Sequence, residues 1–162
     1  MTDSMTSLTL DATLARAGPA AESFARLWRS LWRQGHVPPE LLELCRLTLA
    51  RLHDDPAEIA VANGLLDLPP AAARRAAVVE GRALDDPAFS DAEKAALIFA
   101  EYYWIDPQSI TDDVAGDVKT HFGEAGLVFL IEALGCIDGR IRTARCLRDI
   151  AVHAPEREVA HV

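Results

Sequence analysis

The sequence contains few cysteines and no closely spaced pair of them. Among its 162 residues the cysteines are Cys45, Cys136 and Cys146. An odd number of cysteines far apart in the chain excludes the disulfide framework of a small secreted domain and favours a reducing compartment, so we expect a cytoplasmic protein. With 50% hydrophobic residues, a chain of this length buries roughly 70% of its unfolded surface without cross-links. One domain with an ordinary apolar core is therefore expected.

Basic charge is also scarce. There are 16 Lys and Arg residues against 25 Asp and Glu, which gives a formal net charge of -9. This charge opposes contact with phosphate backbones and anionic lipid, so we expect neither nucleic acid nor a membrane as a partner. The N-terminus lacks the apolar core of a signal peptide. The longest apolar run, residues 125–137, is interrupted by Glu132 and predicts a core helix rather than a membrane span.

Strand patterns are missing beyond residue 18. No window there alternates apolar and polar residues over several positions, and no Asn-Gly turn joins two β-branched segments. Apolar residues recur instead at helical spacing, first at Phe24, Leu27, Trp28 and Leu31. The sequence therefore predicts an all-α fold. We expect a flexible N-terminal arm over residues 1–18, one helical domain over residues 19–153 and a C-terminal tail over residues 154–162.

Helix boundaries are indicated by proline, glycine and capping residues. The segment 38–53 begins with two prolines and is apolar nearly all round, which is typical of a helix in the middle of a bundle. Asp55 and Glu58 fit the N-cap and third position of a further helix, with Glu58 reaching back to the cap, and Ser90 with Glu93 is a second capping-box pattern. Gly123 ends one helix or separates it from the last one. In that last helix we expect these residues to face inward: Leu127, Leu130, Ile131, Leu134 and Ile141.

Three segments resemble a known family. They read ELCRLTLARLHDDPAE (43–58), LDDPAFSDAEKAALIFAEYY (84–103) and HFGEAGLVFLIEALGCIDGR (121–140). They are similar to the alkylhydroperoxidase D-like branch of the carboxymuconolactone decarboxylase superfamily, and the similarity covers roughly residues 36–150. The resemblance implies a compact multi-helix bundle that forms a homo-oligomer, a trimer or a hexamer.

The redox centre of that family is missing from this sequence. The family's conserved Glu corresponds to Glu43, but its two cysteine positions fall on Asp55 and Glu58 and its His position on Ala62. Without a resolving thiol, peroxidase or disulfide-reductase activity is not expected. Cys45 lies on an apolar stripe, where its thiol should be inert.

Ionisable replacements at the redox positions predict a different chemistry. Glu43, His53, Asp55 and Glu58 could form an acid/base cluster that moves protons on a small organic acid or lactone, as in a non-thiol lyase or decarboxylase. Each residue also has a structural interpretation. Asp55 and Glu58 fit a capping box, Glu43 can pair with Arg46 three residues on, and His53 suits a helix C-terminus.

Two further residues are candidates for substrate binding. Arg140 falls on the family's closing arginine and could hold a carboxylate through two parallel hydrogen bonds. Trp104 belongs to an aromatic cluster that could line a ligand pocket. We expect no cofactor. We also expect no metal, because the cluster of Glu43, His53, Asp55 and Glu58 contains only one histidine and no HxxxH or ExxH pair. The alternative hypothesis is a catalytically silent protein that binds a small molecule or serves as an oligomeric scaffold.

Overall fold

Helices joined by short loops make up residues 5–153, the part of the chain that the computed structural model describes, and no strand occurs there. This confirms the predicted all-α fold. In chain order the elements are α1 (Asp11–Leu14), the 3-10 helix η1 (Ala15–Ala17), α2 (Pro19–Leu31), α3 (Pro39–Leu52), α4 (Pro56–Ala60), α5 (Ala72–Val79), α6 (Asp91–Ile105), the 3-10 helix η2 (Pro107–Ser109) and α7 (Asp112–His153).

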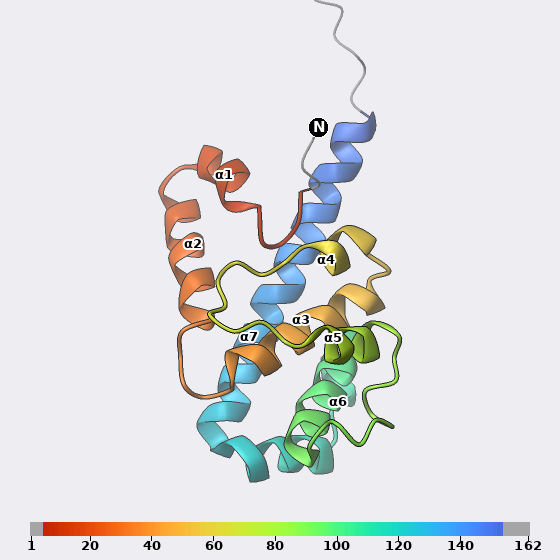
Figure 1. The fold of residues 1–162 in the computed structure, drawn as a ribbon. Helices are drawn as coiled ribbons and strands as arrows, with labels where there is room; N and C mark the ends of the chain where they lie inside the picture. The colour runs from red at the N-terminus through yellow and green to blue at the C-terminus, as the bar shows by residue number, and fades with distance from the viewer. Residues whose placement is uncertain (1–4, 154–162) are drawn as a thin grey trace, which may run out of the picture.

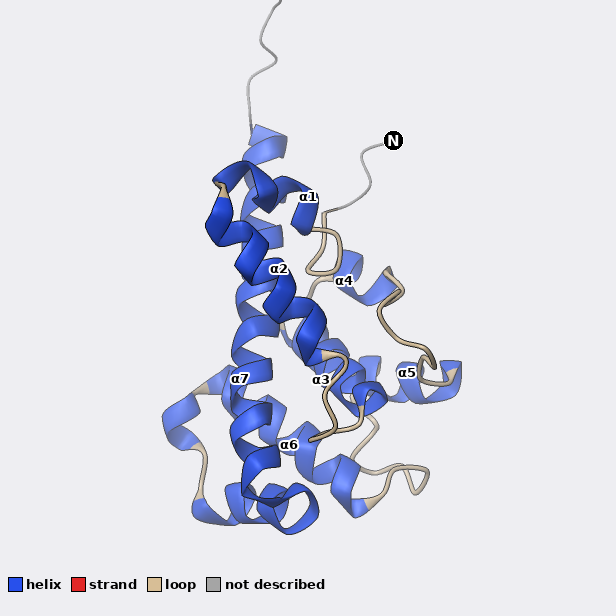
Figure 2. Ribbon diagram, turned by 90° about the vertical axis from the view of Figure 1, so that its left-hand side faces the viewer, coloured by secondary structure: helices blue, strands red, loops and turns tan. Residues whose placement is uncertain are grey.

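The long helix α7 runs the height of the molecule and the other elements are arranged around it (Figure 1). Helices α3 and α6 pack against each other and against α7. The short helices α4 and α5 pack on α3. Helices α1 and α2 form a hairpin beside the upper half of α7, at the left in Figure 1 and toward the viewer in Figure 2. Within residues 5–153, α7 is also the one helix long and apolar enough to cross a membrane, a property that core helices share.

The helix boundaries follow the predicted caps. Ser90 and Glu93 form a complete capping box at the start of α6, with Ser90 N donating to Glu93 Oε2 at 2.9 Å. Asp55 caps α4 by accepting the backbone N–H of Glu58 at 3.2 Å. Gly123 has φ 70° and ψ 178° and bends α7, a conformation that glycine adopts without the steric cost of a Cβ atom.

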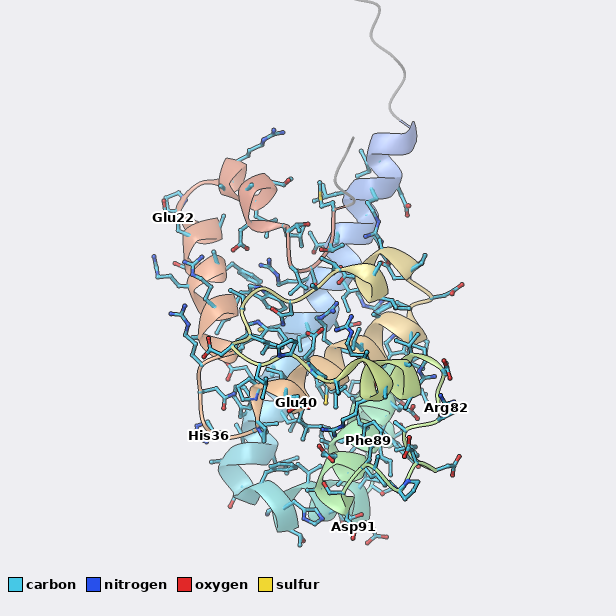
Figure 3. The ribbon with its side chains drawn as sticks, in the orientation of Figure 1. Glu22, His36, Glu40, Arg82, Phe89 and Asp91 are labelled. Atoms are coloured by element: carbon cyan, nitrogen blue, oxygen red, sulfur yellow. The ribbon has the colours of Figure 1, made fainter. Side chains whose placement is uncertain are left out.

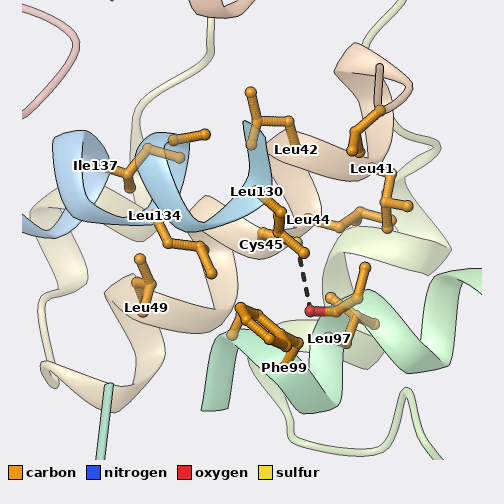
Figure 4. Packing of buried hydrophobic residues seen from close by; sticks show 14 of the residues in the cluster. Leu41, Leu42, Leu44, Cys45, Leu49, Leu97, Phe99, Leu130, Leu134 and Ile137 are labelled. Atoms are coloured by element: carbon orange, nitrogen blue, oxygen red, sulfur yellow. Dashed lines mark hydrogen bonds between the residues drawn. The ribbon is translucent and has the colours of Figure 1, made fainter. Parts of the chain in front are cut away.

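Helix α3 lies at the centre of the core, as its apolar pattern predicts. Ten consecutive residues, 41–50, are buried. Leu42, Cys45 and Leu49 pack against residues of α6 and α7 (Figure 4). A helix surrounded on all sides must carry apolar residues on every face. Any polar residue in this segment then needs a buried partner.

Arg74 links helix α5 to two of its neighbours. Arg74 donates to Glu40 at 2.9 Å and bonds Glu93, and its guanidinium lies 4.8 Å from the ring centroid of Phe89. Glu40 and Phe89 are labelled in Figure 3. The two ion pairs and the cation–π contact of Arg74 thus connect α5 to α3 and to the start of α6.

The predicted flexible arm is packed over residues 5–17, which corrects the expectation for that part. Thr6, Ser7 and Leu10 are buried there. The reason is that the polar groups of this segment have buried partners far away in sequence: Ser7 bonds Glu58 on α4 and accepts from Arg140 on α7. Local composition does not reveal such partners. Residues 1–4, and the predicted tail over residues 154–162, lie outside the described part.

Two residues expected to face inward are exposed instead. Phe24 on α2 is 52% exposed and Ile131 on α7 is 44% exposed. Trp28 and Leu31 of the same predicted stripe are buried. The difference arises because the α1–α2 hairpin does not close on this part of α7, so that Phe24 and Ile131 both face a groove between α2 and α7.

Candidate functional site

The predicted acidic residues Glu43 and Glu58 meet at one fully buried arginine. Arg46 Nη2 lies 2.7 Å from Glu43 Oε1 and its Nε lies 2.8 Å from Glu43 Oε2. Its Nη1 lies 3.0 Å from Glu58 Oε2. All three side chains are 0% exposed. Burial by itself lowers the pKa of Arg46, but the hydrogen bonds and charges of Glu43 and Glu58 outweigh it and raise the pKa above its ordinary value.

Further donors complete the hydrogen bonding of both carboxylates. Glu43 also accepts from Asn63 at 3.0 Å and from Arg75 at 3.2 Å. Glu58 accepts from the backbone N–H of Ser7 and from its hydroxyl, the latter at 2.8 Å. Two carboxylates and two guanidiniums therefore balance each other in a closed cluster. Because its carboxylates are fully buried, no ligand atom reaches Glu43 or Glu58 in this conformation.

The capping box predicted for Asp55 and Glu58 is only half formed. Asp55 is the cap, but the Glu58 carboxylate turns to Ser7 and Arg46 instead of reaching back to the cap's N–H. A buried arginine makes stronger, charge-assisted hydrogen bonds than a backbone N–H does. The predicted ion pair between Glu43 and Arg46 is confirmed.

His53 and Asp55 do not join this cluster but bond the C-terminal part of α7. His53 Nε2 lies 2.6 Å from Asp138 Oδ1, and Arg145 donates to the His53 carbonyl at 2.6 Å. Arg148 bonds the Asp55 carboxylate. The four predicted acid/base residues thus divide into two ionic groups: Glu43 and Glu58 around Arg46, and His53 and Asp55 against α7. In both groups the side chains pair with other residues of the protein.

Of the two predicted substrate-binding residues, Trp104 packs against the second group. Its ring lies edge-to-face on His53, with the centroids 5.8 Å apart. Tyr103, its neighbour in sequence, faces the groove between α2 and α7. The sequence identified the aromatic cluster but not which of its rings faces a cavity, because that depends on how α6 is rotated against α7.

Arg140, the other predicted binding residue, is 2% exposed and lines the same groove. Its Nε donates to the Ser7 carbonyl at 2.7 Å and its Nη2 to Asp11 at 2.8 Å, while its guanidinium lies 4.4 Å from the centroid of the Trp28 ring. Nη1 has no hydrogen-bond partner among residues 5–153. Burial lowers the pKa of Arg140, and Asp11 offsets this only in part.

The groove has a volume of about 610 Å³, within the range of ligand pockets. Helices α1 and α2 and the 3-10 turn between them form one wall, α7 forms the other, and Tyr103 contributes from α6. Most of the residues that line it are apolar or small: Leu10, Leu14, Ala17, Ala20, Ala21, Phe24, Ile131, Gly135 and Gly139. A Cβ atom built on Gly139 meets nothing within 4 Å, whereas one built on Gly135 would lie 3.0 Å from the Tyr103 hydroxyl. The missing side chain of Gly139 therefore leaves open space in the groove.

The three cysteines are predicted to differ strongly in reactivity. Burial raises the pKa of Cys45 to about 12, so its thiol is protonated and shielded at pH 8. Cys136 is half-buried in the groove and Cys146 is exposed. We expect iodoacetamide to modify Cys146 first, Cys136 more slowly and Cys45 only after unfolding, measured by peptide mass spectrometry. Rapid labelling of Cys45 in the native protein would contradict the buried position of α3.

Searches of the chain against protein-family models, curated proteins and solved structures gave no match. The similarity to the carboxymuconolactone decarboxylase superfamily, and the oligomer that it implies, therefore stay predictions from the sequence. Within residues 5–153, no three His, Cys, Asp or Glu side chains are grouped so as to hold a metal ion. Functional inference from here depends on the buried ionic cluster and on the groove.

Proposed function

We propose that this protein binds a small, largely apolar molecule in the groove between α2 and α7. The observation that carries the proposal is the groove itself: about 610 Å³, lined mainly by apolar and small residues, with Phe24 and Ile131 left exposed along it. Large apolar side chains that line a concave surface are typical of ligand sites.

The same geometry supports binding over the acid/base chemistry that we predicted for the carboxylates. Glu43 and Glu58 are fully buried and fully paired. A catalytic acid or base must come within hydrogen-bond reach of the proton that it transfers. Among the predicted site residues, Arg140 alone lines the groove. We therefore propose a small-molecule-binding protein whose buried carboxylates stabilise the fold.

Filling the groove is the direct test of this function. Gly139→Leu places an apolar side chain beside α7, where the backbone is helical and the added Cβ atom has no heavy atom within 4 Å. We expect decanol and decanoate to raise the thermal midpoint of the wild type, since a ligand at a hundredfold its dissociation constant adds about 2.7 kcal/mol. The Gly139→Leu variant should show no such shift.

Gly116→Leu is the matched control. Gly116 also lies in α7 with open space around its Cβ position, but away from the groove. Both substitutions gain helix propensity of up to about 1 kcal/mol, so both unliganded proteins should melt at or above the wild-type midpoint. Equal ligand shifts in both variants would overturn the proposed site, and the absence of any shift in the wild type would overturn the function.

A further inference from the structure

One nitrogen of the Arg140 guanidinium is buried without a hydrogen-bond partner among the described residues. Nε and Nη2 are engaged by the Ser7 carbonyl and by Asp11, whereas Nη1 lacks a partner among the residues described. A guanidinium is never neutral at physiological pH and presents five donors, and a buried donor without a partner is costly. The groove therefore contains, along one wall, a cation whose hydrogen bonding is incomplete.

Asp11 is the carboxylate that pairs with Arg140, and it is the more exposed of the two side chains. The Asp11 side chain is 36% exposed, while that of Arg140 is 2% exposed. Asp11 also lies 3.6 Å from Arg29, so it has a second cation to pair with if it leaves Arg140. Two guanidiniums here share a single carboxylate, so Asp11 balances only part of their positive charge.

A carboxylate elsewhere in the groove, that of Glu132, restricts the ligand to an anion with a single negative group. Glu132 lies on α7 eight residues before Arg140 and lines the same cavity. Eight residues of α-helix span about 12 Å. A second negative group at the far end of a ligand would therefore meet Glu132, whereas an uncharged chain would meet Ile131 and Phe24.

We propose that the ligand of the groove is a medium-chain monocarboxylate whose head group replaces Asp11 on Arg140 and whose alkyl chain lies along α7 toward Ile131. This inference rests on the proposed function of the groove and adds the chemical class of the ligand. Asp11 then acts as an internal competitor. The carboxylate of the ligand and that of Asp11 bind the same guanidinium, so that weakening one strengthens the other.

The test compares four probes of defined chemistry by isothermal titration: octanoate, decanoate, decanol and decanedioate. The wild type should bind decanoate at least tenfold more tightly than decanol, and decanedioate more weakly than decanoate. Each additional buried methylene should tighten binding about fourfold, so octanoate should bind more weakly than decanoate. Equal affinity for decanoate and decanol would overturn the carboxylate assignment.

Asp11→Asn tests the competition. Removing the competing charge should raise the affinity for decanoate about fivefold and leave that for decanol unchanged. Glu80→Gln is the control: it changes the net charge equally but removes an exposed pairing with Arg82, outside the groove. Asp11→Ala should act in the same direction as Asp11→Asn, and a thermal melt of each variant shows that it folds.

The outcomes separate this proposal from the one on which it rests. One outcome is that decanol and decanoate bind equally, that Gly139→Leu blocks the binding of both, and that Asp11→Asn changes neither affinity. The groove is then a binding site, but Arg140 does not recognise a carboxylate. If Asp11→Asn and Glu80→Gln raise decanoate affinity alike, the effect comes from net charge and the competition is refuted. If no probe binds, both proposals fail.

Discussion

Replacing Arg46 with methionine should lower the free energy of unfolding by about 3–5 kcal/mol, the cost of leaving a buried charge without its partner. Methionine preserves much of the side-chain volume, so the loss reports the charge rather than a cavity. Arg46 pairs with Glu43 and Glu58, both 0% exposed, and the substitution removes a partner from each. Urea unfolding monitored by circular dichroism gives the value.

A combined variant identifies the cause of that loss. The triple variant Arg46→Met, Glu43→Gln, Glu58→Gln should be more stable than Arg46→Met alone at pH 7. Arg82→Met, which breaks an exposed pair with Glu80, should change stability by less than about 0.5 kcal/mol. A small loss at Arg46 would show that the cluster contributes little to the fold.

The parts of the fold that depend on local sequence were predictable. The apolar pattern of residues 38–53 placed that helix in the core, and ten consecutive residues there are buried. Ser90 and Glu93 form the capping box that their spacing predicts. Gly123 bends α7 with a positive φ. In each case the determinant lies within four residues of the feature, so one sequence is enough to find it.

The site residues were found in part, because their roles depend on contacts between distant segments. The pairing of Glu43 with Arg46 spans three residues and follows from helix geometry. The contact between Glu58 and Ser7 spans 51 residues, and no pattern near Glu58 distinguishes it from an ordinary capping residue. Phe24 and Ile131 have the spacing of buried residues, but the hairpin of α1 and α2 leaves both exposed in the groove.

Arg140 connects the ionic cluster to the groove. It lines the groove, and it donates to the carbonyl of Ser7, whose N–H and hydroxyl bond Glu58 in the cluster. The segment 5–17 therefore holds the buried charges and forms one wall of the groove at the same time. Stability and ligand binding should depend together on this segment, which the sequence predicted to be a flexible arm.

Deleting residues 1–17 tests whether the N-terminal segment is a flexible arm or a packed part of the fold. A flexible arm is dispensable, and its loss leaves the thermal midpoint unchanged. In the structure the deletion removes the partners that Ser7 provides to Glu58 and Arg140, and it exposes the surface that Leu10 buries. These losses together predict a destabilisation of about 4 kcal/mol or more, measured by urea unfolding of the shortened and full chains.

A point variant shows which part of the segment matters. Ser7→Ala removes the hydroxyl bond to Glu58 but keeps the backbone N–H and carbonyl that bond Glu58 and Arg140. It should therefore cost only about 1–3 kcal/mol, the cost of one buried hydrogen bond. A peptide of residues 1–17 added to the shortened chain should restore part of the lost stability, because its contacts with the bundle do not require a covalent connection. A shortened chain as stable as the full one would mean that Glu58 and Arg140 find other partners, and the groove would then lack the wall on which the proposed binding site depends.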